Sequence, residues 1–159
     1  MDASQIYVLG YAMGGMTGLY AAALDGRIAG VASFSGFTPM RTDTDAKNTV
    51  GIRRLFESHA LLPKLGLFDD RELRIPFDYG DVIRLIAPRP CLIESPTKDI
   101  EADIDDVIRC VKGAEDAWAG TNPTGAIALP GLTHQTPRDI NRFQADQQDT
   151  FLEWLQLGD

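Results

Sequence analysis

One stretch near the start of the chain constrains its fold more than any other. It reads Tyr7-Val8-Leu9-Gly10-Tyr11-Ala12-Met13-Gly14-Gly15-Met16. The β-branched and aromatic residues from Ile6 to Leu9 predict a short strand, and the small residues from Gly14 to Leu24 predict a helix. Gly10 falls where the strand ends, so the chain has to turn sharply between the two elements. We therefore expect a strand, a tight glycine turn and a helix in immediate succession.

The glycines of this turn match the frame of a nucleophile elbow, G-x-S-x-G, with an alanine in the place of the serine. In such an elbow the central residue is exposed at the end of the strand, and the helix directs its positive N-terminal dipole at the reacting centre. We expect the glycines at both ends of the frame, Gly10 and Gly14, to keep Cβ atoms out of the turn. The central residue here is Ala12. The frame is present, but the nucleophilic oxygen is absent.

On these residues the chain resembles the α/β-hydrolase superfamily. The segment from Gly10 to Met16 is similar to the elbow of the dienelactone-hydrolase, acetyl-xylan-esterase and prolyl-oligopeptidase-like branches, which have a serine in the position of Ala12. The resemblance implies a serine ester hydrolase that acts on small or carbohydrate acyl esters. It also implies that the backbone N–H of Met13 contributes to an oxyanion hole. An ordinary strand-to-helix glycine turn without any chemistry is the alternative interpretation of the same residues.

Length and composition limit the classes of protein that remain. A chain of 159 residues is long enough for one domain with a substantial core. Lys+Arg 15 against Asp+Glu 23 gives a net charge of −8, which disfavours nucleic acid as a partner. No apolar run approaches the roughly 20 residues that cross a bilayer, so we expect no membrane partner. Two cysteines and two histidines are too few for a disulfide framework or a multi-histidine metal site, and we expect no cofactor and no metal.

The rest of the chain alternates predicted strands and helices. Further strands are expected at 28–35, 91–94 and 126–129, and helices at 81–86, 104–118 and about 139–157. This alternation predicts an α/β fold, with a parallel sheet of about four strands covered by helices on both faces. Residues about 37–80 interrupt it, and we expect a helical insertion there. The resemblance places that insertion over the active site as a lid; a packing insertion without substrate contact is the alternative.

The resemblance also assigns the two other residues of a catalytic triad. Asp99, in the loop after the predicted strand 91–94, matches the acid, and His134, in the loop after the predicted strand 126–129, matches the histidine. The chain order of residue 12, Asp99 and His134 is the order of nucleophile, acid and histidine in the superfamily. A surface or helix-capping role is the alternative for Asp99, because Asp103 and other carboxylates lie nearby. Asp103 is itself a candidate N-cap of the following helix.

Ala12 carries a methyl group where the triad needs an oxygen, so we expect this chain to be inactive or impaired as an enzyme. Two origins of Ala12 stay open: an engineered Ser→Ala change, and a natural loss that leaves a non-catalytic binding or scaffold module. Ser35 also ends a predicted strand, but it lacks an elbow, and we do not expect it to replace the serine. His59, inside the insertion, is expected to be structural. A nucleotide-binding domain is disfavoured because residues 10–15 do not match G-x-G-x-x-G.

The predicted elbow strand follows the N-terminus almost directly. A complete α/β-hydrolase has several strands before its elbow, and a loop after one of them supplies the second oxyanion N–H. We therefore expect residues 1–159 to form a single domain that corresponds to the C-terminal half of the fold. Its elbow strand would be an exposed edge, which predicts a homo-oligomer or a complementary N-terminal half as a partner, besides a small-molecule ester substrate. The compartment stays open, with a soluble cytoplasmic protein expected if the N-terminus is native.

Overall fold

A parallel sheet of four strands forms the framework of the chain. The computed structural model describes residues 5–47, 49, 51–119, 131–137 and 145–156. The strands are β1 (Ile6–Tyr11), β2 (Ile28–Phe34), β3 (Cys91–Glu94) and β4 (Leu132–Gln135). Each strand pairs with the next one along the chain, so β1 and β4 are the two edges of the described sheet. The predicted parallel α/β sheet is confirmed.

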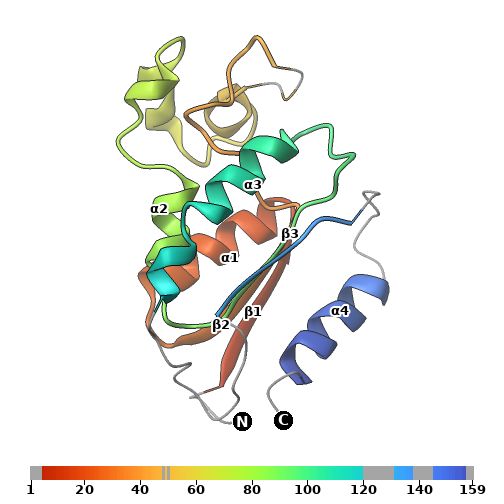
Figure 1. Ribbon diagram of the computed structural model, residues 1–159. Coiled ribbons are helices and arrows are strands. Elements are labelled where there is room, and N and C mark those ends of the chain that lie inside the picture. Colours follow the sequence, from red (N-terminus) through yellow and green to blue (C-terminus); the bar gives the residue numbers. More distant parts are fainter. Residues whose placement is uncertain (1–4, 48, 50, 120–130, 138–144, 157–159) are drawn as a thin grey trace.

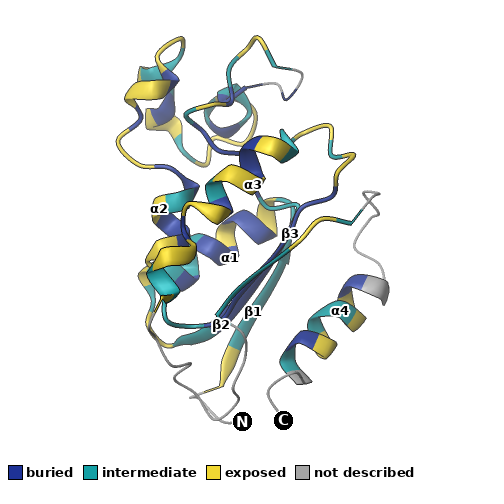
Figure 2. Ribbon diagram, in the orientation of Figure 1, coloured by how far each residue is buried: buried dark blue, intermediate teal, exposed yellow. Residues whose placement is uncertain are grey.

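Helices cover both faces of this sheet. Helices α1 (Met13–Leu24), α2 (Tyr79–Arg84) and α3 (Ile104–Lys112) lie on one face, and α4 (Ala145–Gln156) lies on the other (Figure 1). Successive side chains of a strand point to opposite faces, so Val31 of β2 belongs to the core under α1–α3, while Ala32 belongs to the core under α4. Trp154 of α4 is buried against that second face. Figure 2 shows β2 and β3 buried between the two layers.

Side-chain caps fix where α2 and α3 begin. Asp78 and Asp81 form a capping box at the start of α2, which therefore begins at Tyr79, two residues before the predicted start. The carboxylate of Asp103 accepts a hydrogen bond from the N–H of Asp106 at 3.1 Å, so the predicted N-cap of α3 is confirmed. The prediction of one helix over 104–118 is wrong. Helix α3 ends at Lys112, and a separate 3₁₀ turn covers Glu115–Trp118.

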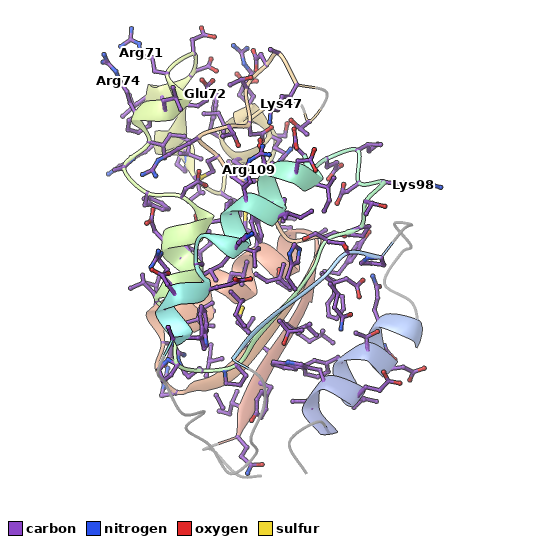
Figure 3. The ribbon with its side chains drawn as sticks, in the orientation of Figure 1. Lys47, Arg71, Glu72, Arg74, Lys98 and Arg109 are labelled. Carbon is purple, nitrogen blue, oxygen red and sulfur yellow. The ribbon has the colours of Figure 1, made fainter. Side chains whose placement is uncertain are left out.

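The segment between β2 and α2 contains three short helical turns. They are a π-helical turn, η1 (Arg54–Ser58), and two 3₁₀ turns, η2 (Pro63–Phe68) and η3 (Glu72–Arg74). The segment lies beyond the end of the sheet towards which the strands run (Figure 1). Lys47, labelled in Figure 3, ties it to α3, because its ammonium group lies 2.8 Å from Asp103 and also bonds Asp106.

The last described strand covers a segment for which no strand was predicted. Residues 126–129, where a strand was expected, lie outside the described residues, and β4 occupies Leu132–Gln135, which had been predicted as a loop. His134 is therefore part of a strand. The first residues of the predicted last helix, 139–144, also lie outside the described residues, and α4 covers the remainder. Among the described helices, none combines the length and the apolar character needed to span a membrane.

Candidate functional site

Ala12 has the backbone of an elbow although it lacks the serine oxygen. Its φ is 50° and its ψ is −120°, a conformation that residues with a Cβ atom rarely adopt. Two hydrogen bonds hold it there: its N–H donates to the carbonyl of Phe34 at 2.8 Å, and its own carbonyl accepts from the N–H of Met16 at 3.0 Å. The second bond starts α1, so the strand turns into the helix at this residue. The predicted strand, turn and helix are confirmed.

The glycines that make the turn possible are Gly10 and Gly15. A Cβ atom on Gly10 would lie 2.2 Å from the carbonyl oxygen of Gly14, and one on Gly15 would lie 2.8 Å from Oγ of Ser33. A Cβ atom on Gly14 would meet no atom within 4 Å. The expectation that Gly14 keeps the turn free is therefore wrong. Gly15 is the residue that has to lack a Cβ atom, because α1 approaches β2 closely there.

A pocket with a cavity volume of about 70 Å³ opens beside the elbow. It brings Ala12 and Met13 together with Asp99, from the loop after β3. Its apolar wall is formed by Met16, Phe37, Leu55, Leu61 and Tyr79, and its other polar residues are Ser35, Arg54, His59 and Glu101. Because the carboxyl ends of parallel strands meet at one edge of a sheet, this is the place where an α/β fold binds its ligands.

Asp99 is held in the wall of this pocket by its own loop. Its Oδ1 accepts a hydrogen bond from the N–H of Glu101 at 2.8 Å, and its N–H donates to the carbonyl of Pro96 at 3.2 Å. Burial raises the pKa of its carboxyl group, although the hydrogen bond from Glu101 opposes that shift. Asp103, the rival carboxylate in the sequence, caps α3. The two carboxylates thus have different surroundings, and Asp99 is the one that lines the pocket.

His134 is not among the residues that line the pocket. It lies in β4 opposite Ile93 of β3, and its Nε2 is buried without a hydrogen-bond partner among the described residues. Burial lowers the pKa of its imidazole, and the charge of Glu115 opposes that shift. Strands β1 and β4 are three strand spacings apart, roughly 14 Å. The structure therefore brings together Ala12, Met13 and Asp99 but not His134, whose catalytic role stays a prediction.

Two residues that the sequence analysis had set aside do line the pocket. Ser35, at the end of β2, has a positive φ of 49°, and its Oγ is buried without a partner among the described residues. His59 follows η1 and is exposed at the pocket wall. The position of Ser35 at a strand end is a signal that sequence reasoning can use. No sequence signal points to His59, because its place depends on how the segment between β2 and α2 packs.

Arg54 is the guanidinium group of the pocket wall, and its position is set by several bonds. It donates hydrogen bonds to the carbonyls of Thr49 at 2.5 Å and Glu101 at 3.0 Å, and it pairs with Asp43 at 3.2 Å. The side chain of Asp43 is only 1% exposed. Burial raises the pKa of that carboxyl group, while a hydrogen bond from Thr49 and the charge of Arg54 oppose the shift.

One group of carboxylates has the spacing of metal ligands. Oxygen atoms of Asp45, Asp69 and Asp70 lie within 4.8 Å of one another, in the segment between β2 and α2. The guanidinium of Arg53 already pairs with two of them, at 3.3 Å from Asp45 and 2.8 Å from Asp69. The cluster is thus an ion-pair network that has its own cation.

Comparisons with known proteins agree with the observed fold. An α/β-hydrolase family model described as Phospholipase/Carboxylesterase matches residues 1–61. Carbohydrate esterase MZ0003, from an unknown prokaryotic organism, is 31% identical over 122 residues, which are 74% of this chain and 28% of that protein. The chain thus spans little more than a quarter of that relative.

Solved structures match the whole chain. A promiscuous CE15 esterase from a marine bacterial metagenome has a TM-score of 0.80 at 23% identity, over 100% of this chain and 43% of the other. A CE15 glucuronoyl esterase from Teredinibacter turnerae T7901 has a TM-score of 0.75 at 20% identity, over 98% of this chain and 41% of the other. The parallel sheet, the elbow backbone at Ala12 and these similarities together show that the chain belongs to the α/β-hydrolase superfamily.

Proposed function

We propose that the chain carries the site of a serine ester hydrolase whose nucleophile position is occupied by Ala12. The observation that carries this proposal is the elbow backbone of Ala12, kept at a φ of 50° beside a pocket that also holds Asp99. An elbow of this kind exists to present a side chain to a ligand. The name of the carbohydrate esterase relative supports esters of carbohydrates, or other small acyl esters, as the substrate class.

The chemistry follows from the residues around position 12. With a serine there, Oγ attacks the ester carbonyl carbon while a histidine takes its proton, and the alcohol leaves with that proton. The N–H of Met13, at the start of α1, donates to the developing oxyanion. Asp99 orients the histidine and stabilises its charge. With Ala12 no acyl-enzyme forms at this position, so the chain binds the ester without cleaving it.

Two histidines compete for the role of the base. His134 has the position that the chain order of the superfamily assigns to it. His59 lines the pocket together with Ala12 and Asp99. We keep His134 as the proposed base and His59 as a contact of the substrate, and the experiment below distinguishes them.

A non-catalytic binding module is the second candidate function. The methyl group of Ala12 favours it, because the pocket and the elbow are present while the reacting oxygen is not. Such a module would bind the same class of ester and release it unchanged.

We further propose that β1 pairs along its free edge, with a second copy of the chain or with a complementary N-terminal half. Among the described strands β1 pairs with β2 alone, and an unpaired edge is a template for another strand. Light scattering tests this, and a well-folded species that is strictly monomeric at all concentrations contradicts it.

The test of the function is labelling with a fluorophosphonate, followed by intact-mass measurement, for the chain and for Ala12→Ser. We expect labelling of Ala12→Ser alone, together with hydrolysis of short-chain esters. Adding His134→Ala to Ala12→Ser is expected to abolish labelling, whereas adding His59→Ala is expected to keep it. The opposite result would transfer the role of the base to His59. No labelling of a folded Ala12→Ser protein that still binds esters would favour the binding module.

A further inference from the structure

We propose that an apolar groove next to the pocket binds an aliphatic chain of the ester. The groove lies between residues 61–68 and residues 75–77, in the segment between β2 and α2. The inference rests on the proposed function, because the aliphatic chain belongs to the ester whose carbonyl group lies beside Ala12. It adds a second subsite, and with it a preference for one kind of ester.

The groove has the size and the lining of a small-molecule site. Its volume is about 540 Å³, within the usual range of ligand pockets. Lys64 is the only one of its lining residues with a polar side chain. Leu67 is 76% exposed and Phe77 is 37% exposed, so the groove holds large apolar side chains in contact with water. A ligand without polar groups is therefore the kind that gains most by entering it.

Leu61 connects this groove to the pocket. Its side chain lines both, and it is 42% exposed. The pocket and the groove thus meet at Leu61, and we expect a ligand that fills the pocket to reach the groove by extending past this residue. This continuity favours an extension of the pocket's ligand over an independent protein segment as the occupant.

The chain as it stands is suited to a binding test, because Ala12 prevents turnover at position 12. We propose isothermal titration with methyl esters of straight-chain acids from butanoate to octanoate. Each buried methylene is worth about 0.8 kcal/mol, so the dissociation constant is expected to fall by up to about fourfold for each methylene that passes Leu61. A parallel series of acetate esters, from butyl to octyl, shows whether the aliphatic chain lies on the acyl or the alcohol side.

Two matched variants locate the effect. Leu67→Asp places a charge in the groove and is expected to remove the dependence of the dissociation constant on chain length. Leu24→Asp is the control: Leu24 is 80% exposed at the end of α1, away from the groove, and the dependence on chain length should persist. Both positions are on the surface, so both variants are expected to fold.

The outcomes separate the groove from the proposed function. If butanoate binds and the longer esters bind with the same dissociation constant, the proposal for the groove is overturned, while ester binding in the pocket is still supported. A dependence on chain length that Leu67→Asp removes would support the groove even if Ala12→Ser fails to react with the fluorophosphonate. Self-association of the chain that Leu67→Asp abolishes would show that a second copy covers the groove, and would overturn the proposal.

Discussion

Ala12 and Ser35 directly follow the neighbouring strands β1 and β2, both have a positive φ, and both line the same pocket. The N–H of Ala12 bonds the carbonyl of Phe34, the residue before Ser35, at 2.8 Å. Backbone of this kind costs on the order of 1–3 kcal/mol per residue and persists only where the surrounding structure enforces it. Two of the four described non-glycine residues with positive φ thus meet at one site.

The strain at Ser35 can be measured with two substitutions. Both Ser35→Gly and Ser35→Ala remove the buried hydroxyl group, but only glycine also relieves the positive φ. Glycine also adds conformational entropy to the unfolded chain, which offsets part of this relief. We therefore expect Ser35→Gly to be more stable than Ser35→Ala by about 1 kcal/mol. Urea denaturation measures the difference. If Ser35→Ala proves the more stable, position 35 is not strained.

The glycines of the elbow are predicted to differ sharply in their tolerance of a methyl group. Gly10→Ala brings a Cβ atom to 2.2 Å from a backbone oxygen, and we expect a loss of about 3 kcal/mol or more in the free energy of unfolding. Gly14→Ala meets open space inside α1, and we expect a gain of about 0.5–1 kcal/mol. Thermal unfolding of the two variants is the measurement. If Gly10→Ala and Gly14→Ala lost the same amount of stability, the conclusion that Gly10, and not Gly14, has to lack a Cβ atom would be contradicted.

Arg54 is predicted to stabilise the pocket wall through Asp43. Arg54→Met leaves the buried carboxylate of Asp43 without its cation, and removing one partner of a buried pair costs about 3–5 kcal/mol. The control is Arg27→Met, since Arg27 forms an exposed pair with Asp25 and its loss should leave the stability nearly unchanged. Adding Asp43→Asn to Arg54→Met is expected to recover part of the loss. Equal effects of Arg54→Met and Arg27→Met in denaturant melts would count against a buried pair.

Glu94 is predicted to make stability depend on pH. Burial at the end of β3 raises the pKa of its carboxyl group, although a hydrogen bond from Gln147 opposes the shift. A group whose pKa is higher in the folded state contributes stability at low pH, and that contribution is lost as the pH rises through the folded pKa.

We therefore expect Glu94→Gln to raise the melting temperature at pH 7 and to have little effect below about pH 4, since the unfolded carboxyl titrates near 4.3. Glu153→Gln, which removes a carboxylate at an exposed position of α4, is the control for the loss of one negative charge. The prediction would be contradicted if the difference in melting temperature between Glu94→Gln and the unsubstituted chain stayed constant from pH 4 to pH 7.

Elements with local signals were predictable from the sequence. Strand β3 has the predicted bounds, Cys91–Glu94, because an apolar run between prolines and a polar loop is a local pattern. The start of α3 was also predictable, because the cap at Asp103 acts over three residues. The end of α3 and the place of β4 were not, because neither Gly113 nor the segment before His134 carries a pattern that outweighs packing. Periodicity alone extended the predicted helix beyond Lys112.

The sequence by itself determined the strand, turn and helix around Ala12, the alternation of strands and helices, and the place of Asp99 in the loop after β3. These depend on contacts between residues that are close along the chain. Only the tertiary structure decided that Ser35, His59 and Leu61 share the pocket, that Gly15 rather than Gly14 is sterically required, and that His134 lies in β4. Those facts depend on the close approach of segments distant in sequence, and such distances have no counterpart in local patterns.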